Sequence, residues 1–230
     1  MKIYVLSADK SIHITEGLQY CVNKYWKENP SVVLLGYKKP KFKLDKNFKF
    51  VSLGDDRGPK YIGEDLINFF NQINDKHFIF TVDDFFPIRQ IDINLYNYLY
   101  KKMISENISR ISLTDQVSDK PHEIIEQKDN YNIIEMGQMA NYRKSAVWSM
   151  WEKSYFLKYM WDTMNLWEWE LDTNCMNDNH RVVGTDKKFI LQACHLYRRG
   201  KLKSDWFKDS ESTDTMFKED QSIIADIIYK

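Results

Sequence analysis

Two adjacent aspartates, Asp83 and Asp84, directly follow residues 77–82, a very apolar run of the chain. A buried strand that ends in two acids places carboxylates at the rim of a sheet. Hard oxygen ligands there suit Mg²⁺ or Mn²⁺, and such an ion can in turn neutralise a diphosphate. The alternative is an acidic strand-to-loop transition in which one aspartate caps the following turn. The spacing alone leaves both interpretations open.

The elements that must position these acids alternate between strand and helix through residue 84. Apolar, β-prone runs predict strands at residues 2–8, 31–36, 48–53 and 77–82. Apolar stripes at helical spacing predict one helix that Thr15 can cap and that runs through Tyr25, and a second from about Tyr61 to Asn74. This alternation predicts an α/β domain with a largely parallel sheet.

Open sheets of this kind bind ligands beyond the carboxyl ends of their strands. Three polar clusters follow predicted strands: Ser7-Ala8-Asp9-Lys10, Gly54-Asp55-Asp56-Arg57 and Asp83-Asp84. They are far apart in the sequence, but the predicted fold would bring them together. We therefore expect a ligand site at this edge of the sheet.

The second half of the chain has a less regular pattern. Its expected elements are a helix over residues 94–106, a strand over 110–113, a loop or hairpin over 117–132 and a helix around 186–196. Residues 145–164 carry an aromatic stripe at helical spacing. The amphipathic stretch 223–228 predicts a docked helix, with a partner-binding helix as the alternative.

Composition limits the class of protein. The 230 residues include 33 Lys+Arg and 33 Asp+Glu, so the formal net charge is zero and a basic nucleic-acid footprint is absent. No apolar stretch approaches the roughly 20 residues of a membrane span, and the first residues lack the features of a signal peptide. The three cysteines have no CxxC spacing, which indicates neither a disulfide framework nor a zinc site. We expect a cytoplasmic protein (in the host cytoplasm if the source is viral).

Three segments resemble a group of GT-A-type glycosyltransferase-like proteins of bacteria and large DNA viruses or phages. Residues 77–92 are similar to that group's apolar strand followed by Asp-Asp-(Tyr/Phe)-Phe and Val/Ile-Asp. Residues 142–170 are similar to its run of aliphatic-Trp, a tyrosine/leucine helix and Asn-Pro-Trp-Glu-Phe-Glu. Arg199-Gly200-Lys201, with Trp206 shortly after, resembles its C-terminal Gly-Lys-Trp stretch. The segments occur in the same order and at similar spacing.

The resemblance implies a GT-A-like, Rossmann-like fold with a central mixed, mostly parallel sheet flanked by helices. We expect a single domain over residues 1–230. Within it, residues 1–92 would form a nucleotide-binding half, residues 93–210 an acceptor side, and residues 211–230 a C-terminal tail.

The resemblance also implies a donor site. Asp84 would hold a Mn²⁺ or Mg²⁺ ion that bridges the donor diphosphate, and Asp83 would contact ribose or sugar. Ser7, Asp9 and Arg57 would line the nucleoside pocket, with Asp9 accepting hydrogen bonds and Arg57 donating from its planar fork. The alternative role for Ser7, Asp9 and Arg57 is that of an ordinary turn residue.

Late in the chain, other polar groups could join this site. GT-A enzymes often recruit an extra metal ligand in this region, where His180 and His195 occur, although a lone histidine is more often structural. The basic cluster 198–201 could hold the departing diphosphate or form a solvated helix end.

The segment Trp167-Glu168-Trp169-Glu170 offers a candidate base. Inverting sugar transfer needs a carboxylate near the acceptor hydroxyl, with its basicity tuned by a partly apolar setting. We predict Glu170 as the catalytic base, with Glu168 as the second candidate. The two would share a side in an extended segment and point about 200° apart in a helix. The alternative is a tryptophan-rich packing segment with solvated acids.

Three functions follow from these features. The first is a metal-dependent, inverting glycosyltransferase that moves a sugar from a nucleotide-sugar donor, with a UDP-sugar favoured, to a glycan, lipid-linked or protein acceptor. The second is a non-catalytic sugar-binding or assembly protein that uses a surface of tryptophans: Trp148, Trp151, Trp161, Trp167 and Trp169. The third is a metal-dependent phosphohydrolase or nucleotidyltransferase that reuses Asp83 and Asp84.

Overall fold

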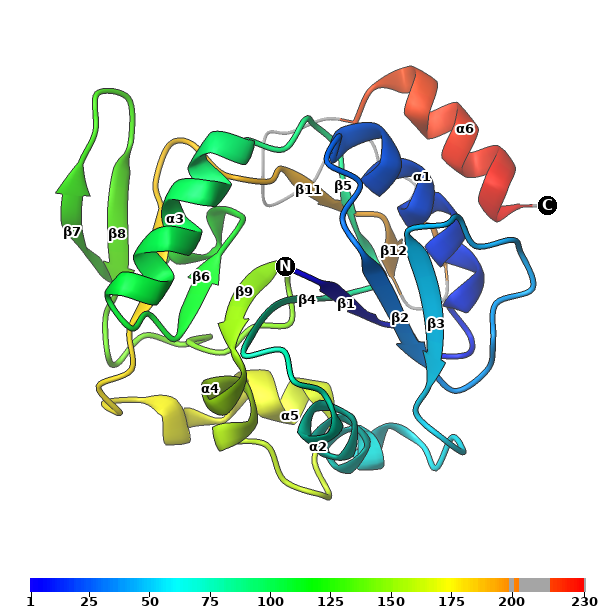
Figure 1. Cartoon of the computed structure of the whole chain (residues 1–230), viewed down its shortest axis with the longest axis horizontal. Helices are drawn as coiled ribbons and strands as arrows, with labels where there is room; N and C mark the ends of the chain where they lie inside the picture. Colours follow the sequence, from blue (N-terminus) through cyan, green and yellow to red (C-terminus); the bar gives the residue numbers. More distant parts are fainter. Residues whose placement is uncertain (199–200, 203–215, 230) are drawn as a thin grey trace. The chain divides into compact units, whose positions relative to one another are not determined.

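The computed structural model describes residues 1–198, 201–202 and 216–229. The chain divides into two compact units. The first comprises Met1–Ser52, Thr81–Ile91 and Leu191–Lys230, and the second comprises Leu53–Phe80 and Asp92–Ile190. Figure 1 labels the helices and strands and colours them along the sequence. No helix in the described residues combines the length and the apolar character needed to cross a membrane.

The four strands predicted for the N-terminal part are confirmed. They are β1 (Ile3–Leu6), β2 (Val32–Gly36), β3 (Phe48–Ser52) and β4 (His77–Val82). They lie in one sheet in the order β3-β2-β1-β4, and β2 pairs in parallel with both β1 and β3. Every residue of β1 and β2 is buried, as expected for parallel strands covered on both faces. Strand β4 is common to the two units.

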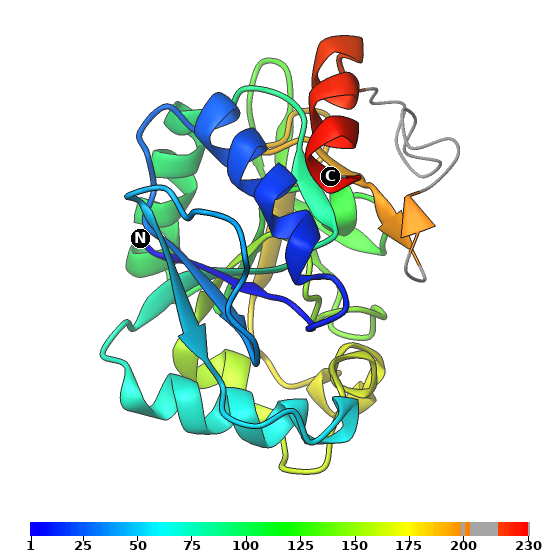
Figure 2. The same cartoon turned by 90° about the vertical axis from the view of Figure 1, so that its right-hand side faces the viewer.

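Two helices of the first unit pack against each other. The first, α1 (Thr15–Tyr25), buries the apolar face that the sequence predicts, and α6 (Lys218–Ile228) lies along it (Figure 2). The docked C-terminal helix is therefore confirmed. The prediction that Thr15 caps α1 is wrong, because a 3₁₀ turn (Ile12–Ile14) precedes the helix and the Thr15 hydroxyl donates back to the carbonyl of Ile12 (2.6 Å).

The second unit continues from β4 in the strand order β4-β9-β6-β10-β8-β7. Its further strands are β6 (Arg110–Ser112), β7 (His122–Gln127), β8 (Asn132–Met136), β9 (Ser149–Glu152) and β10 (Val182–Thr185). Strands β6 and β10 are parallel, and the other pairs in this unit are antiparallel. Its α-helices are α2 (Ile62–Gln72), α3 (Ile93–Ser105), α4 (Lys153–Lys158) and α5 (Leu166–Leu171). The predicted α/β fold class, a mixed sheet flanked by helices, is confirmed.

Helix predictions in the second half are wrong in two places. Residues 149–152 of the aromatic stripe form β9, a strand between β4 and β6, and only residues 153–158 are helical. Aromatic residues pack on a central strand as well as on a helix, so their spacing misleads here. The segment 186–196 contains no helix, because residues 193–195 pair with β5 instead.

A cluster of aromatic rings fixes α5 in the second unit. Trp169 is fully buried, with ring centroids 5.3 Å from Trp151 of β9 and 5.1 Å from Phe156 of α4. Phe156 in turn contacts Phe70 of α2 at 4.9 Å. Because aromatic pairs stabilise beyond the area they bury, α5 is held firmly although it has only six residues.

Candidate functional site

The carboxyl ends of three strands of the first unit meet around Asp83. The Asp83 amide follows β4 and donates to the carbonyl of Leu6, the last residue of β1 (3.1 Å). Ser7, the next residue of that segment, donates its amide to Leu35 of β2 (2.8 Å). The polar residues after β1 and β4 thus come together, as the strand order requires.

The carboxylate of Asp83 turns into the protein. The residue is only 7% exposed, and its Oδ2 accepts hydrogen bonds from the hydroxyls of Ser7 (2.5 Å) and Ser11 (2.6 Å). Burial raises the pKa of Asp83 to about 6, against the lowering effect of the two hydroxyls, and the neighbouring charge of Asp84 adds to the rise. Two fixed donors therefore hold Asp83 in one orientation.

The carboxylate of Asp84 faces a histidine. Its Oδ2 lies 2.8 Å from Nε2 of His195, and both side chains are about a quarter exposed. Its Oδ1 is buried and has no hydrogen-bond partner among the described residues. The His195 ring stacks on Phe85, with centroids 4.5 Å apart and planes within 9°. Buried polar atoms in proteins usually have a hydrogen-bond partner, so this oxygen is a position at which a water or an ion could bind.

A short antiparallel pair brings His195 to this place. Strand β5 (Phe85–Pro87) pairs with β11 (Ala193–His195), and His195 lies opposite Phe85. The next residue, Leu196, donates its amide to the Asp84 carbonyl (3.0 Å). Because side chains alternate along a strand, the fully buried Cys194 enters the core while His195 points the other way.

The donor atoms of Asp84 and His195 suit a divalent ion whose remaining ligands are oxygens of a bound substrate. A carboxylate oxygen and an imidazole nitrogen are suitable donors for Mn²⁺, and Mg²⁺ is commonly bound by one or two carboxylates plus substrate phosphates. Within residues 1–198, 201–202 and 216–229, no group of three His, Cys, Asp or Glu side chains is placed to hold a metal ion. An ion held here would receive only part of its coordination shell from these two side chains, and a diphosphate and waters would have to complete it.

The other predicted donor-site residues make local contacts. Asp9, in the first unit, accepts the amide of Lys38 on Oδ1 (2.8 Å) and pairs through Oδ2 with the Lys38 ammonium (3.4 Å). Arg57, in the second unit, pairs with Glu64 (2.9 Å) and Asp65 (2.5 Å) of α2. Both terminal nitrogens of Arg57 are thus engaged in its own unit.

The two glutamates of the Trp-Glu segment lie on a helix, α5, and so point in different directions. Glu168 forms a capping box with Asn165: each accepts the other's backbone amide at 2.9 Å. Glu170 is half-buried and accepts the amide of Ala146 on Oε1 (2.6 Å). Burial lowers the pKa of the enclosed Arg110 to about 10, and the charge of Glu170 is among the groups that counter this. Glu168 therefore has a capping role, and Glu170 is the half-buried one, held by the Ala146 amide and near the charge of Arg110.

His180 has partners within the second unit. Its Nδ1 lies 2.7 Å from the Ser109 hydroxyl and its Nε2 lies 3.0 Å from the Lys158 ammonium.

No sequence pattern points to Ser11, whose role depends on its hydrogen bond to Asp83. The position of His195 late in the chain makes it a candidate extra metal ligand, but its contact with Asp84 depends on the pairing of β5 with β11. The predicted motif residues Arg199, Gly200 and Trp206 lie outside the described residues.

Comparison with solved structures confirms the GT-A-like fold. HddC from Yersinia pseudotuberculosis is similar with a TM-score of 0.50 and 14% identity over 91% of this chain and 98% of that one. S. aureus TarS 1–349 is similar with a TM-score of 0.50 and 14% identity over 83% of this chain. The match spans 60% of that TarS chain. Glycosyltransferases and nucleotidyltransferases share this fold. No protein-family model and no curated protein sequence matches the chain.

Proposed function

We propose that this chain is a glycosyltransferase that moves a sugar from a nucleotide-sugar donor to a hydroxyl acceptor with the help of a divalent ion. One observation carries the proposal: just after the carboxyl end of β4, Asp84 lies 2.8 Å from His195 and has a buried Oδ1 that no described residue hydrogen-bonds. This edge is where open α/β sheets bind their ligands. A UDP-sugar is the favoured donor class, and the acceptor is a glycan, a lipid-linked sugar or a protein.

The site residues of the first unit have the following roles in this proposal. Asp84 and His195 hold Mn²⁺ or Mg²⁺ together with the donor diphosphate. The ion, when bound, supplies Lewis-acid charge for the leaving nucleotide. Ser7 and Ser11 hold Asp83 inward through their hydroxyl groups, which fixes the turn that presents Asp84.

We assign the base of an inverting transfer to Glu170. Its carboxylate is half-buried, and the Ala146 amide fixes its orientation. A positioned carboxylate in a partly apolar setting is suited to accept the proton of a hydroxyl group. Glu168 is the weaker candidate, because it is exposed and completes the cap of α5.

Calorimetry with a panel of UDP-sugars tests the ion site. We expect donor binding that requires Mn²⁺ or Mg²⁺ and that Asp84→Asn and His195→Gln each weaken by at least about tenfold, since loss of even an outer partner of a metal site has effects of this size. Glu28→Gln, an exposed acid of the first unit, is the matched control and should bind as wild type. Equal affinity in EDTA and in Mn²⁺ for all these proteins would leave Asp84 and His195 with a structural role.

Product analysis then separates the reaction classes. A glycosyltransferase releases UDP only as an acceptor gains a sugar. Release of pyrophosphate from a nucleoside triphosphate and a sugar phosphate would identify a nucleotidyltransferase, and release of inorganic phosphate a phosphohydrolase. Donor binding without turnover on any acceptor would favour the non-catalytic alternative.

A further inference from the structure

A run of lysines follows β2 and enters β3. Between residues 38 and 49 the chain has one acid, Asp45, and six lysines: Lys38, Lys39, Lys41, Lys43, Lys46 and Lys49. All six lysines are exposed. We call residues 38–49 the lysine segment. The segment has an excess of positive charge, whereas the whole chain has a formal net charge of zero.

The lysine segment is largely uncompensated. Lys38 pairs with Asp9 at 3.4 Å, and the other five lysines form no ion pair with any residue that the structure describes. The one acid of the segment faces α1, because Oδ2 of Asp45 accepts a hydrogen bond from Asn23 (2.6 Å). Exposed like charges at this density repel one another, and an external anionic surface would relieve that repulsion.

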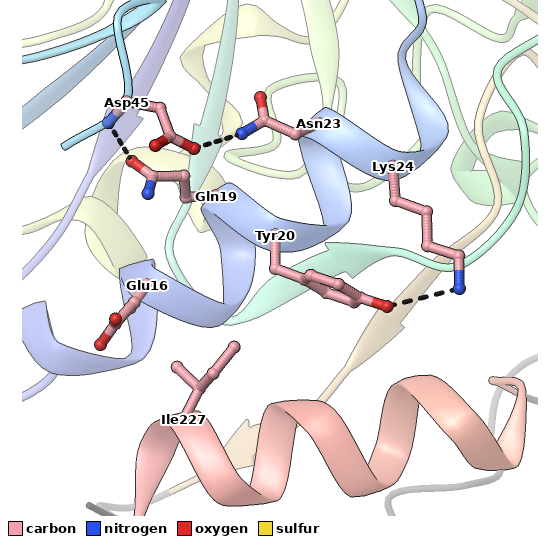
Figure 3. A pocket seen from close by; sticks show the side chains of 7 residues that line it. All are labelled: Glu16, Gln19, Tyr20, Asn23, Lys24, Asp45 and Ile227. Carbon is pink, nitrogen blue, oxygen red and sulfur yellow. Dashed lines mark hydrogen bonds between the residues drawn. The ribbon is translucent and has the colours of Figure 1, made fainter. Parts of the chain in front are cut away.

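The backbone of the lysine segment is fixed on α1. The Asp45 amide donates to Gln19 (3.0 Å), whose own amide group donates to the Lys43 carbonyl (3.4 Å). Figure 3 shows Gln19 and Asn23 reaching from α1 to Asp45, along a surface pocket. The lysines are therefore presented by a held backbone rather than by a loose loop.

We propose that the lysine segment docks this protein on a membrane surface that contains anionic phospholipids. The charge comes from lysine alone, without arginine, and lysine is a hydrated point charge that suits a fluid layer of headgroup phosphates. Nucleic-acid sites instead use arginine forks and exposed aromatic rings for stacking. Neither occurs here: Phe42 is half-buried and Phe48 is buried.

The lysine segment crosses from one edge of the sheet to the other. It begins beside Asp9, which pairs with Lys38, and it ends where Phe48 pairs with Val32 at the start of β2. The docking itself does not depend on the proposed function, because it can be measured without donor or acceptor.

Co-sedimentation of the full-length protein with vesicles tests the proposal. We expect binding to vesicles of phosphatidylcholine mixed with phosphatidylglycerol and none to phosphatidylcholine alone. The binding should be lost as salt rises from about 0.1 M to about 1 M, because the screening length falls from ~10 Å to ~3 Å. The triple variant Lys39→Gln, Lys41→Gln, Lys43→Gln should bind on the order of 100-fold more weakly, at about fivefold per lysine.

A matched control separates position from net charge. The triple variant Lys27→Gln, Lys101→Gln, Lys187→Gln removes three exposed lysines from elsewhere and should bind within about twofold of wild type, since these positions lie outside the segment. Equal weakening in both triple variants would overturn the proposal. So would no binding to either vesicle, equal binding to both vesicles, or tighter binding to single-stranded or duplex nucleic acid than to the anionic vesicles.

Discussion

Asp83 and Asp84 form the turn between β4 and β5, and their carboxylates meet different partners. The carboxylate of Asp83 is buried against the hydroxyls of Ser7 and Ser11, whereas that of Asp84 meets His195. One acid thus stabilises the end of β4, and the other retains a carboxylate oxygen to which none of the described residues donates a hydrogen bond. The order Asp-Asp alone does not distinguish the two roles. The distinction comes from Ser11 and His195, 72 and 111 positions away from their respective aspartates.

The proposed base gives a prediction for a single side chain. Glu170→Gln should slow sugar transfer about 10²–10⁴-fold while donor affinity stays close to wild type, because a positioned base acts on the chemical step. Glutamine keeps an oxygen that can accept the Ala146 amide, so the fold should survive. The measurement is transfer to a library of acceptors, with donor affinity and thermal melting recorded in parallel.

Glu168→Gln is the control for that experiment. Glutamine serves in a capping box as glutamate does, so α5 should remain and transfer should stay near the wild-type rate. Wild-type transfer by Glu170→Gln would rule Glu170 out as the base. A large drop in its melting temperature would instead make Glu170 a structural residue that holds the segment at Ala146.

At the scale of elements, Gly63 sets how closely α2 approaches a neighbouring loop of the second unit. Its amide donates to the Met164 carbonyl (2.9 Å), and a Cβ at this position would lie 2.2 Å from the carbonyl oxygen of Trp161. Gly63→Ala should therefore destabilise the protein by about 1–3 kcal/mol through overpacking, although alanine is the better helix former. Urea unfolding measures the change.

Asn71→Ala, at an exposed position of the same helix, is the control for Gly63→Ala. It should leave the free energy of unfolding unchanged or raise it slightly, because only helix propensity changes. A Gly63→Ala protein as stable as this control would mean that the Trp161 loop can move away from α2.

The junction of α1 and α6 is held by a buried acid. Asp220 is fully buried and accepts hydrogen bonds from Tyr20 (2.6 Å), Lys24 and Tyr25. Burial by itself would raise the pKa of Asp220, but these donors outweigh it and the pKa lies below its ordinary value. A lowered carboxyl pKa adds stability above the unfolded-state value, and this stability is lost as pH falls through the folded-state value.

Asp220→Asn should consequently loosen α6 at neutral pH by about 1.5–3 kcal/mol, the usual range for hydrogen bonds to a charged group. Hydrogen exchange of the α6 amides measures this, with Glu219→Gln, an exposed neighbour, as the control. The difference between wild type and Asp220→Asn should shrink below about pH 4, as the wild-type carboxyl gains its proton. A difference that is the same at acid and neutral pH would contradict the role of the charge.

The sequence predicts an element well when the pattern of that element's own residues is enough to identify it as a strand or a helix. Strand β2 is a run of five residues that are all buried, and the turns around it are polar. Strand β9 is different, because Trp148, Trp151 and Tyr155 also satisfy helical spacing. Strand β11 has three residues and exists through its pairing with β5. Local patterns cannot reveal a strand whose stability comes from a distant partner.

For the molecule as a whole, the balance of charges predicts its solubility. With 33 basic and 33 acidic residues, the formal net charge is zero at pH 7, and molecules without net charge repel one another least. Solubility at low salt should therefore pass through a minimum near pH 7. Precipitation by polyethylene glycol across a pH series measures it, and a solubility that rises steadily through neutral pH would contradict the prediction.

The separation of 111 positions from Asp84 to His195 also bears on how the protein is made. A ribosome delivers the aspartate, together with β1 to β4, long before it delivers the histidine on β11. A nascent chain, or a product cut short after β10, therefore has the acid without its imidazole partner. If the pair binds an ion as proposed, ion affinity would rise only once β11 has been made, and it would distinguish chains that contain β11 from chains cut short before it.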